Sequence, residues 1–265
     1  MHPELFRIGP LVINSYGIML ALAFLVGLWI TIQLGKKRGL DPDTITNLAV
    51  VIMLSSIFGA RLLYVLFHLN EFRGRWIYTF VPIQPDGTIG LGGLILLGGV
   101  IAAFIAGTWY VHKKQLPFWK IADSVAPALA IGLFFGRIGC FLNGCCFGKA
   151  CDLPWGVVFP ENSPAGYVFR GIPIHPTQLY SSLYGLIIFL ILIFWERRQP
   201  FDGFLFALFL ILYGIARFTV DFFRYYESQM FILAGLDFNQ VVSIIMVLSG
   251  IGIIYYRARA KLHPE

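Results

Sequence analysis

Residues 16–34 read YGIMLALAFLVGLWITIQL, an apolar stretch without a charged side chain. As a helix, a run of this length spans the hydrocarbon core of a bilayer, which is about 30 Å thick. The run is too long for the core of a signal peptide, and it has no basic cluster before it and no small-residue cleavage site after it. We therefore predict a transmembrane helix that stays in the mature protein.

Six further runs of the same kind follow along the chain. They cover residues 47–69, 90–111, 121–142, 179–195, 203–222 and 240–256. The composition agrees, because hydrophobic residues make up 58% of the chain and charged residues only 13%, against roughly 25% charged residues in soluble domains. We predict an all-α integral membrane protein with seven transmembrane helices, forming a single domain over residues 1–265 with outer loops at 70–89 and 143–178.

The distribution of Lys and Arg predicts the orientation of the chain in the membrane. Basic residues gather in short segments on one side of the predicted helices, whereas the longer segments of the other side contain fewer. The basic segments are residues 36–38, 113–120, 197–198 and 257–261. By the positive-inside rule, the N-terminus lies outside and the C-terminus in the cytoplasm. This topology explains the net charge of +6, so we expect the lipid bilayer as a partner and no nucleic acid.

Three arginines, Arg61, Arg137 and Arg217, lie inside predicted helices. On insertion scales, each is unfavourable by about 2.5–3.5 kcal/mol at mid-membrane. Each follows the inner end of its helix by a similar number of residues, and the helical rise therefore puts all three at one level in the outer half of the membrane. A single arginine could snorkel outward or pair with a backbone carbonyl. A shared level favours a common anion, such as the phosphate of a lipid headgroup.

The surroundings of two arginines add detail. Tyr213, Arg217 and Asp221 recur at four-residue intervals and form one polar helix stripe, in which an Arg217/Asp221 pair is either structural or catalytic. Arg137 lies in a glycine-rich helix end, where glycines permit close helix packing or expose backbone N–H groups to a phosphate. The glycine pair at residues 98–99 allows the same two interpretations.

Several motifs follow one another in a fixed order along the chain. Residues 136–144 read GRIGCFLNG and residues 154–160 read PWGVVFP. Tyr16-Gly17, GARL at 59–62, HPTQLY at 175–180 and YGIARF at 213–218 accompany them. In this order and spacing, covering most of the chain, the motifs resemble the bacterial prolipoprotein diacylglyceryl transferase family.

The resemblance implies a multi-pass enzyme of the bacterial inner membrane. Such an enzyme moves the diacylglyceryl group of phosphatidylglycerol onto the lipobox cysteine thiol of a prolipoprotein signal peptide and releases glycerol phosphate. Arg137 would bind the headgroup, and Arg217 would stabilise the negative charge that develops on the leaving phosphate. No cofactor and no metal ion are expected. The other residues expected to bind substrate are Tyr16, Arg61, Gly98, Gly99, Asn143, Gly144, Gly148, His175, Gln178, Tyr213 and Asp221.

The sequence departs from the family pattern at several positions. Leu97 occupies the place of a histidine that is proposed to help activate the acceptor thiol, and leucine cannot take a proton. Other polar or acidic positions are occupied by Cys140, Cys145, Ser181 and Asp221. If the chain is active, the candidate bases are His175, Asp221 and Tyr16.

All four cysteines, Cys140, Cys145, Cys146 and Cys151, fall in one short stretch at the predicted outer face. A zinc or redox site is one interpretation, although their spacing is not a standard ligand spacing. One disulfide within the loop is a second, since disulfides are allowed outside the cytoplasm. We favour a third, in which they are small side chains that fill a crowded helix end.

Two other functions stay open. Leu97 allows a divergent membrane protein that binds phospholipid or another anion without transferring it. The cysteines at polar positions allow a transferase with a different acceptor.

Overall fold

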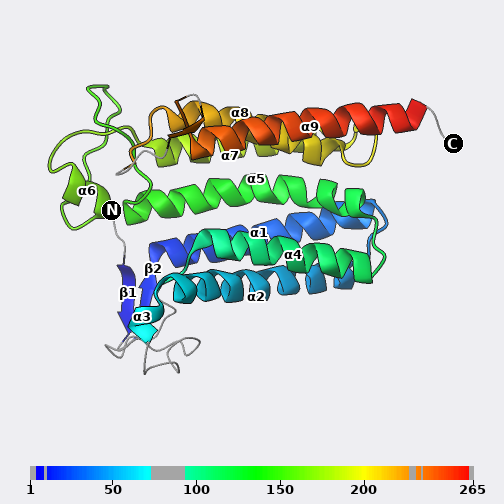
Figure 1. The fold of residues 1–265 in the computed structure, drawn as a ribbon, viewed down its shortest axis with the longest axis horizontal. Coiled ribbons are helices and arrows are strands. Elements are labelled where there is room, and N and C mark those ends of the chain that lie inside the picture. Colours follow the sequence, from blue (N-terminus) through cyan, green and yellow to red (C-terminus); the bar gives the residue numbers. More distant parts are fainter. Residues whose placement is uncertain (1–3, 9–10, 73–92, 227–230, 234, 263–265) are drawn as a thin grey trace. The chain divides into compact units, whose positions relative to one another are not determined.

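The computed structural model describes residues 4–8, 11–72, 93–226, 231–233 and 235–262. Within these ranges, seven helices are long and apolar enough to cross a membrane, which confirms the predicted fold class. They are α1 (Ser15–Lys37), α2 (Pro42–Phe67), α4 (Leu96–Lys113), α5 (Phe118–Asn143), α7 (Thr177–Glu196), α8 (Phe204–Asp221) and α9 (Phe238–Leu262) (Figure 1). The short elements are helices α3 (Leu69–Phe72) and α6 (Pro164–Val168) and strands β1 (Glu4–Ile8), β2 (Leu11–Asn14), β3 (Phe231–Leu233) and β4 (Leu236–Asp237). β1 pairs with β2 and β3 with β4.

The predicted helix limits agree with the observed ones to within a few residues at most ends, and the largest differences are at the end of the seventh helix and the start of the third. The seventh was expected to end at residue 256, but α9 ends at Leu262. The third was expected from residue 90, but α4 begins at Leu96, and residues 90–92 lie outside the described ranges. Gly93 has a φ of +66°, and Ile95, the residue before the helix, is extended. Left-handed and extended backbone cannot continue a helix, so residues 93–95 stay outside α4.

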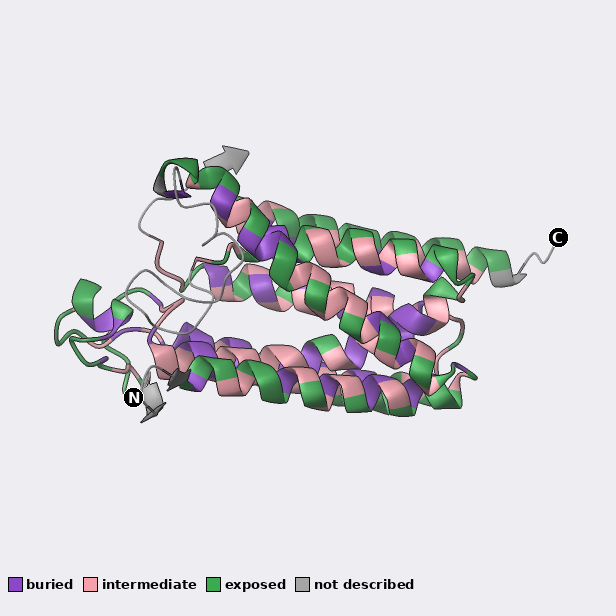
Figure 2. Cartoon of the chain, turned by 90° about the horizontal axis from the view of Figure 1, so that it is seen from below, coloured by how far each residue is buried: buried purple, intermediate pink, exposed green. Residues whose placement is uncertain are grey.

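The long helices carry large apolar side chains that are exposed on the isolated chain. Trp29, Phe104 and Leu248 are each more than half exposed, and exposed positions recur along the helices (Figure 2). In water such a surface would be unfavourable, but the acyl chains of a bilayer solvate it. The chain is thus a multi-pass membrane protein.

The described residues form two compact units, and each has its own packing. In the unit of residues 4–13 and 35–118, α2 and α4 approach closely through glycines. A β-carbon at Gly59 would lie 2.5 Å from the carbonyl oxygen of Gly98, and one at Gly99 would lie 3.0 Å from that of Ser56. Gly98 and Gly99 therefore let the two helix backbones pack together.

The other unit contains α5, α7, α8, α9 and most of α1. Its main hydrophobic core joins three helices, with buried residues from α5, α7 and α8 such as Ala130, Leu192 and Phe209. α9 lies against α8, as Figure 1 shows. At their contact a β-carbon at Gly214 would lie 2.7 Å from the carbonyl oxygen of Ser243.

One fully buried carboxylate fixes the start of α8 against α5. Asp123 accepts hydrogen bonds from the backbone N–H groups of Gly203 at 2.7 Å and Phe206 at 3.0 Å. We expect Asp123→Ala to lower the free energy of unfolding by about 1.5–3 kcal/mol, because two backbone donors lose a charged and fully buried acceptor. Thermal unfolding in detergent measures the loss. Asp152→Ala, at an exposed position, is the control, and an equal effect of both variants would contradict the assignment.

Candidate active site

Arg137 lies on α5, six residues before its last residue, Asn143, and is half-buried. Its guanidinium group interacts electrostatically with the hydroxyls of Tyr184 and Tyr213 and with the thiols of Cys140 and Cys146. No carboxylate among the described residues forms an ion pair with it. A half-buried guanidinium group with phenols and thiols around it is suited to binding an anion.

Arg217 on α8 is held in a network of hydrogen bonds. One of these bonds joins it to Asp221, which confirms the predicted pair. Nη1 donates to Oδ1 of Asp221 at 2.7 Å, and Nη2 donates to the hydroxyl of Tyr226 at 2.9 Å. Tyr226 in turn donates to the same Asp221 oxygen at 2.6 Å and accepts from Nδ2 of Asn239 at 3.1 Å. Burial raises the pKa of the Tyr226 hydroxyl, and its bond to Asp221 acts in the same direction. Arg217 is thus a fixed and largely neutralised cation.

Two tyrosines connect the surroundings of these arginines. Tyr184 on α7 and Tyr213 on α8 have ring centroids 6.1 Å apart in an edge-on arrangement. Each interacts electrostatically with both Arg137 and Arg217. The structure therefore gathers two of the three predicted arginines around one pair of phenols.

The third arginine, Arg61, belongs to the other unit, together with Leu97, Gly98 and Gly99. It is 8% exposed, its Nη1 donates to the carbonyl oxygen of Gly93 at 3.2 Å, and its guanidinium carbon lies 5.2 Å from the ring centroid of Phe72. These contacts hold Arg61 against the residues that precede α4. A common site for all three arginines stays a prediction.

The chain reverses direction at the end of α5. Gly144 has a φ of +73°, and the N–H of Cys145 donates to the carbonyl oxygen of Cys140 at 3.1 Å. This is the bonding pattern of a helix that ends at a left-handed glycine. A β-carbon at Gly144 would also lie 2.8 Å from that of Ser163. The reversal brings Cys145 and Cys146 back beside Cys140.

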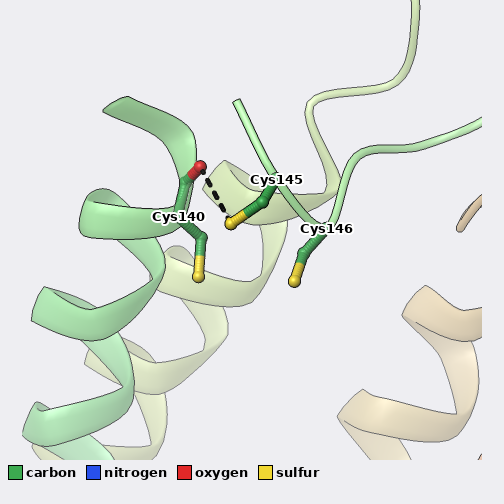
Figure 3. A group of neighbouring side chains, drawn as sticks. All are labelled: Cys140, Cys145 and Cys146. Carbon is green, nitrogen blue, oxygen red and sulfur yellow. Dashed lines mark hydrogen bonds between the residues drawn. The ribbon is translucent and has the colours of Figure 1, made fainter. Parts of the chain in front are cut away.

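The sulfur atoms of Cys140, Cys145 and Cys146 all lie within 4.8 Å of one another (Figure 3). The thiol of Cys145 donates to the carbonyl oxygen of Cys140 at 3.7 Å. All four cysteines, Cys151 included, are free thiols. Hydrogen bonds with the thiols of Cys140 and Cys145 lower the pKa of Cys146, and the charges of Arg224 and Arg137 act in the same direction.

The first residues of α7 hold this cysteine segment in place. The fully buried Gln178 donates to the carbonyl oxygen of Cys145 at 2.8 Å, and Thr177 donates to that of Cys146 at 3.0 Å. Cys146 has a φ of +60°, a conformation that an L-residue keeps only when its surroundings enforce it. Gln178 is therefore a residue that positions the loop.

The loop of residues 144–176 is tied to the end of α8. The N–H of Gly148 donates to the carbonyl oxygen of His175 at 3.1 Å, and that of Lys149 donates to the carbonyl oxygen of Phe223 at 2.9 Å. A β-carbon at Gly148 would lie 2.5 Å from the carbonyl oxygen of His175. Gly148 is thus required for close backbone contact. Nδ1 of His175 lies 3.3 Å from the hydroxyl of Tyr180.

Tyr16 and Asn143 complete the set of predicted residues. Tyr16, on the first turn of α1, interacts electrostatically with Arg137 and with the three clustered cysteines. Gly139 permits this approach, because a β-carbon there would lie 3.1 Å from the Tyr16 ring. The side chain of Asn143 interacts with the thiol of Cys145. Both residues therefore border the same region as Arg137.

Comparison with known proteins identifies the family. The family model described as prolipoprotein diacylglyceryl transferase matches residues 3–256. The chain belongs to this family. Relatives named phosphatidylglycerol--prolipoprotein diacylglyceryl transferase include one from Geobacter sulfurreducens, 34% identical over 100% of this chain and 98% of the relative. Another from Clostridium tetani is 34% identical over 95% and 96%, and one from Aeromonas salmonicida is 35% identical over 94% and 88%.

In this member of the prolipoprotein diacylglyceryl transferase family, three residues of the site were missed in the sequence. Tyr184 lies inside an apolar helix, where a tyrosine is unremarkable. Tyr226 and Asn239 meet Arg217 only because the chain folds back after α8. The glycine at position 144 was the available signal for the turn that gathers the cysteines.

Proposed function

We propose that this protein transfers the diacylglyceryl group from phosphatidylglycerol to the lipobox cysteine thiol of prolipoproteins. The observation that carries the proposal is Arg137, a half-buried cation without a carboxylate partner among the described residues. It stands in a chain that matches, over nearly its whole length, relatives named for this reaction. An unneutralised guanidinium group beneath the membrane surface is suited to a lipid phosphate.

The proposed reaction is a displacement at carbon. The sulfur of the acceptor thiolate forms a bond to the glycerol carbon that bears the phosphate, and the carbon–oxygen bond breaks with its electron pair on the phosphate oxygen. The products are a thioether and glycerol phosphate, which takes up the proton lost by the thiol. Arg137 binds the phosphate, and Arg217, fixed by Asp221 and Tyr226, stabilises the charge on the leaving oxygen.

The remaining predicted residues border this reaction in the proposal. They are Tyr16, Arg61, Gly98, Gly99, Asn143, Gly144, Gly148, His175, Gln178, Tyr213 and Asp221. Within the unit of Arg137, the structure supports contact with substrate most directly for Tyr16 and Tyr213, which interact with its guanidinium group. Asp221 is engaged by Arg217 and Tyr226, which makes it a poor candidate for the base.

We further propose that the protein resides in the bacterial inner membrane with its N-terminus outside and residues 143–178 on the periplasmic face. The basic segments at residues 36–38, 113–120, 197–198 and 257–261 support this orientation. A fluorescent protein that matures only in the cytoplasm is expected to fluoresce when fused after Glu265. Alkaline phosphatase, which is active only in the periplasm, is expected to be inactive when it is fused at the same position. The reverse pattern would refute the orientation.

The test of function uses the full-length protein in vesicles of phosphatidylglycerol with a lipobox peptide. We expect a peptide heavier by one diacylglyceryl group and an equal amount of glycerol phosphate, both read by mass spectrometry. A serine-for-cysteine peptide is the matched control and is expected to stay unmodified. Binding of phosphatidylglycerol without any product would instead support a lipid-binding protein. Transfer to another acceptor in membrane extracts, but not to the peptide, would support a different substrate.

A further inference from the structure

The cluster of Cys140, Cys145 and Cys146 has the composition and size of a metal site. Thiolate sulfur is a preferred ligand of Zn²⁺, at about 2.3 Å, and catalytic zinc sites use three protein ligands with one position open. In a tetrahedral site such ligands lie about 3.8 Å from one another. The three sulfur atoms already lie within 4.8 Å of one another, so small side-chain rotations would close the site.

The backbone around the cluster is held in advance. Gly144 turns the chain back at the end of α5. Thr177 and Gln178 fix the carbonyl groups of Cys146 and Cys145 at 3.0 and 2.8 Å. A binding site whose ligand-bearing segment is fixed in the folded chain loses little entropy when the ion binds. The left-handed conformation of Cys146 also indicates that the surrounding structure constrains this segment.

We propose that Cys140, Cys145 and Cys146 bind one Zn²⁺ ion whose open fourth position takes the thiol of the acceptor cysteine. This inference rests on the proposed function. The thiol loses its proton when its sulfur binds zinc. The zinc-bound thiolate then attacks the glycerol carbon, its electron pair forms the new sulfur–carbon bond, and the neutral thioether leaves the metal. The lost proton ends on the glycerol phosphate.

The site also supplies an activation step, and two of the three candidate bases are engaged by other side chains. Asp221 is bound by Arg217 and Tyr226, and His175 is packed between Tyr180 and Phe223. Cys140 and Cys146 interact with Arg137, the group proposed to bind the lipid phosphate. Zinc at the cluster would therefore hold the acceptor sulfur in the region where the phosphate ester binds.

The first measurement is zinc binding by the full-length protein, purified under reducing conditions and incubated with Zn²⁺ alone. We expect about one zinc ion per chain. The fine structure of its X-ray absorption spectrum should be fitted by three sulfur ligands and one oxygen or nitrogen ligand. Cys146→Ser is expected to lose the ion, whereas Cys151→Ser, which changes a cysteine outside the cluster, is expected to keep it. Three results would overturn the proposal. They are a wild-type chain without bound zinc, equal amounts of zinc in the two variants, and a disulfide that joins two of the three cysteines. The spectrum of the wild-type protein tests whether three sulfur ligands bind zinc even if a variant does not fold.

The second measurement follows the acceptor. Adding the lipobox peptide is expected to raise the sulfur ligands of zinc from three to four, and the serine peptide is expected to leave them at three. Unchanged coordination with the cysteine peptide would refute acceptor binding. Removal of zinc by a chelator should abolish transfer, and Zn²⁺ should restore it. Full transfer by the metal-free chain would overturn the zinc proposal but keep the proposed function. Absence of transfer by a zinc-loaded chain with four sulfur ligands would reject the transferase reaction and keep the metal site.

Discussion

Arg137→Ala is expected to lower kcat/KM for phosphatidylglycerol about 10²- to 10³-fold, the loss typical of removing one group that stabilises developing charge. Arg137 has no carboxylate partner among the described residues, so its full charge is available to the lipid phosphate. Its removal also leaves no buried anion behind, and the fold should therefore tolerate the change. Steady-state kinetics in vesicles with graded phosphatidylglycerol content measure the effect. A change confined to KM would indicate that Arg137 binds the ground state and transition state equally.

Two variants control this result. Arg137→Lys keeps the charge but loses the planar, two-pronged geometry of the guanidinium group, and we expect activity between those of the wild type and Arg137→Ala. Arg170→Ala removes an exposed arginine of the loop that follows α5 and should leave kcat/KM unchanged. If Arg137→Ala retained wild-type activity, Arg137 would not bind the reacting phosphate.

The helices could be predicted from the sequence because a bilayer selects for long apolar runs, and such runs are visible without any knowledge of packing. The start of α4 could not, because the segment before it is as apolar as the helix itself. Only the left-handed conformation of Gly93 and the extended backbone of Ile95 separate the two. The packing of α2 against α4 through Gly59 and Gly98 also depends on contacts that no local pattern specifies.

The candidate site, like the fold, could be predicted from the sequence only in part. The Arg217/Asp221 pair could be predicted, since residues four apart share one helix face. The cysteine cluster could not, because its members meet through a helix end, a reversed turn at Gly144 and the left-handed residue Cys146. Ligand spacings known from other metal sites describe other backbone geometries, so the spacing of these cysteines in the sequence does not reveal that their sulfur atoms meet.

A second large effect is expected at the buried pair on α8. Arg217→Gln removes the ion pair of Asp221, which is 5% exposed, and among the described residues leaves its side chain the hydrogen bond from Tyr226. Removing one partner of a buried ion pair typically lowers the free energy of unfolding by about 3–5 kcal/mol. We expect a loss of this size, measured by thermal unfolding in detergent, together with loss of transfer.

The double variant Arg217→Gln/Asp221→Asn separates the structural role of this pair from its proposed role in the reaction. Two neutral amides can hydrogen-bond without an uncompensated charge, so most of the lost stability should return and the coupling free energy between the two positions should be large. Transfer should stay as low as in Arg217→Gln, because the double variant still lacks the guanidinium group proposed to stabilise the charge on the leaving phosphate oxygen. Recovery of transfer together with stability would mean that Arg217 acts only by holding the end of α8, and that the charge on the leaving group is stabilised by Arg137 alone.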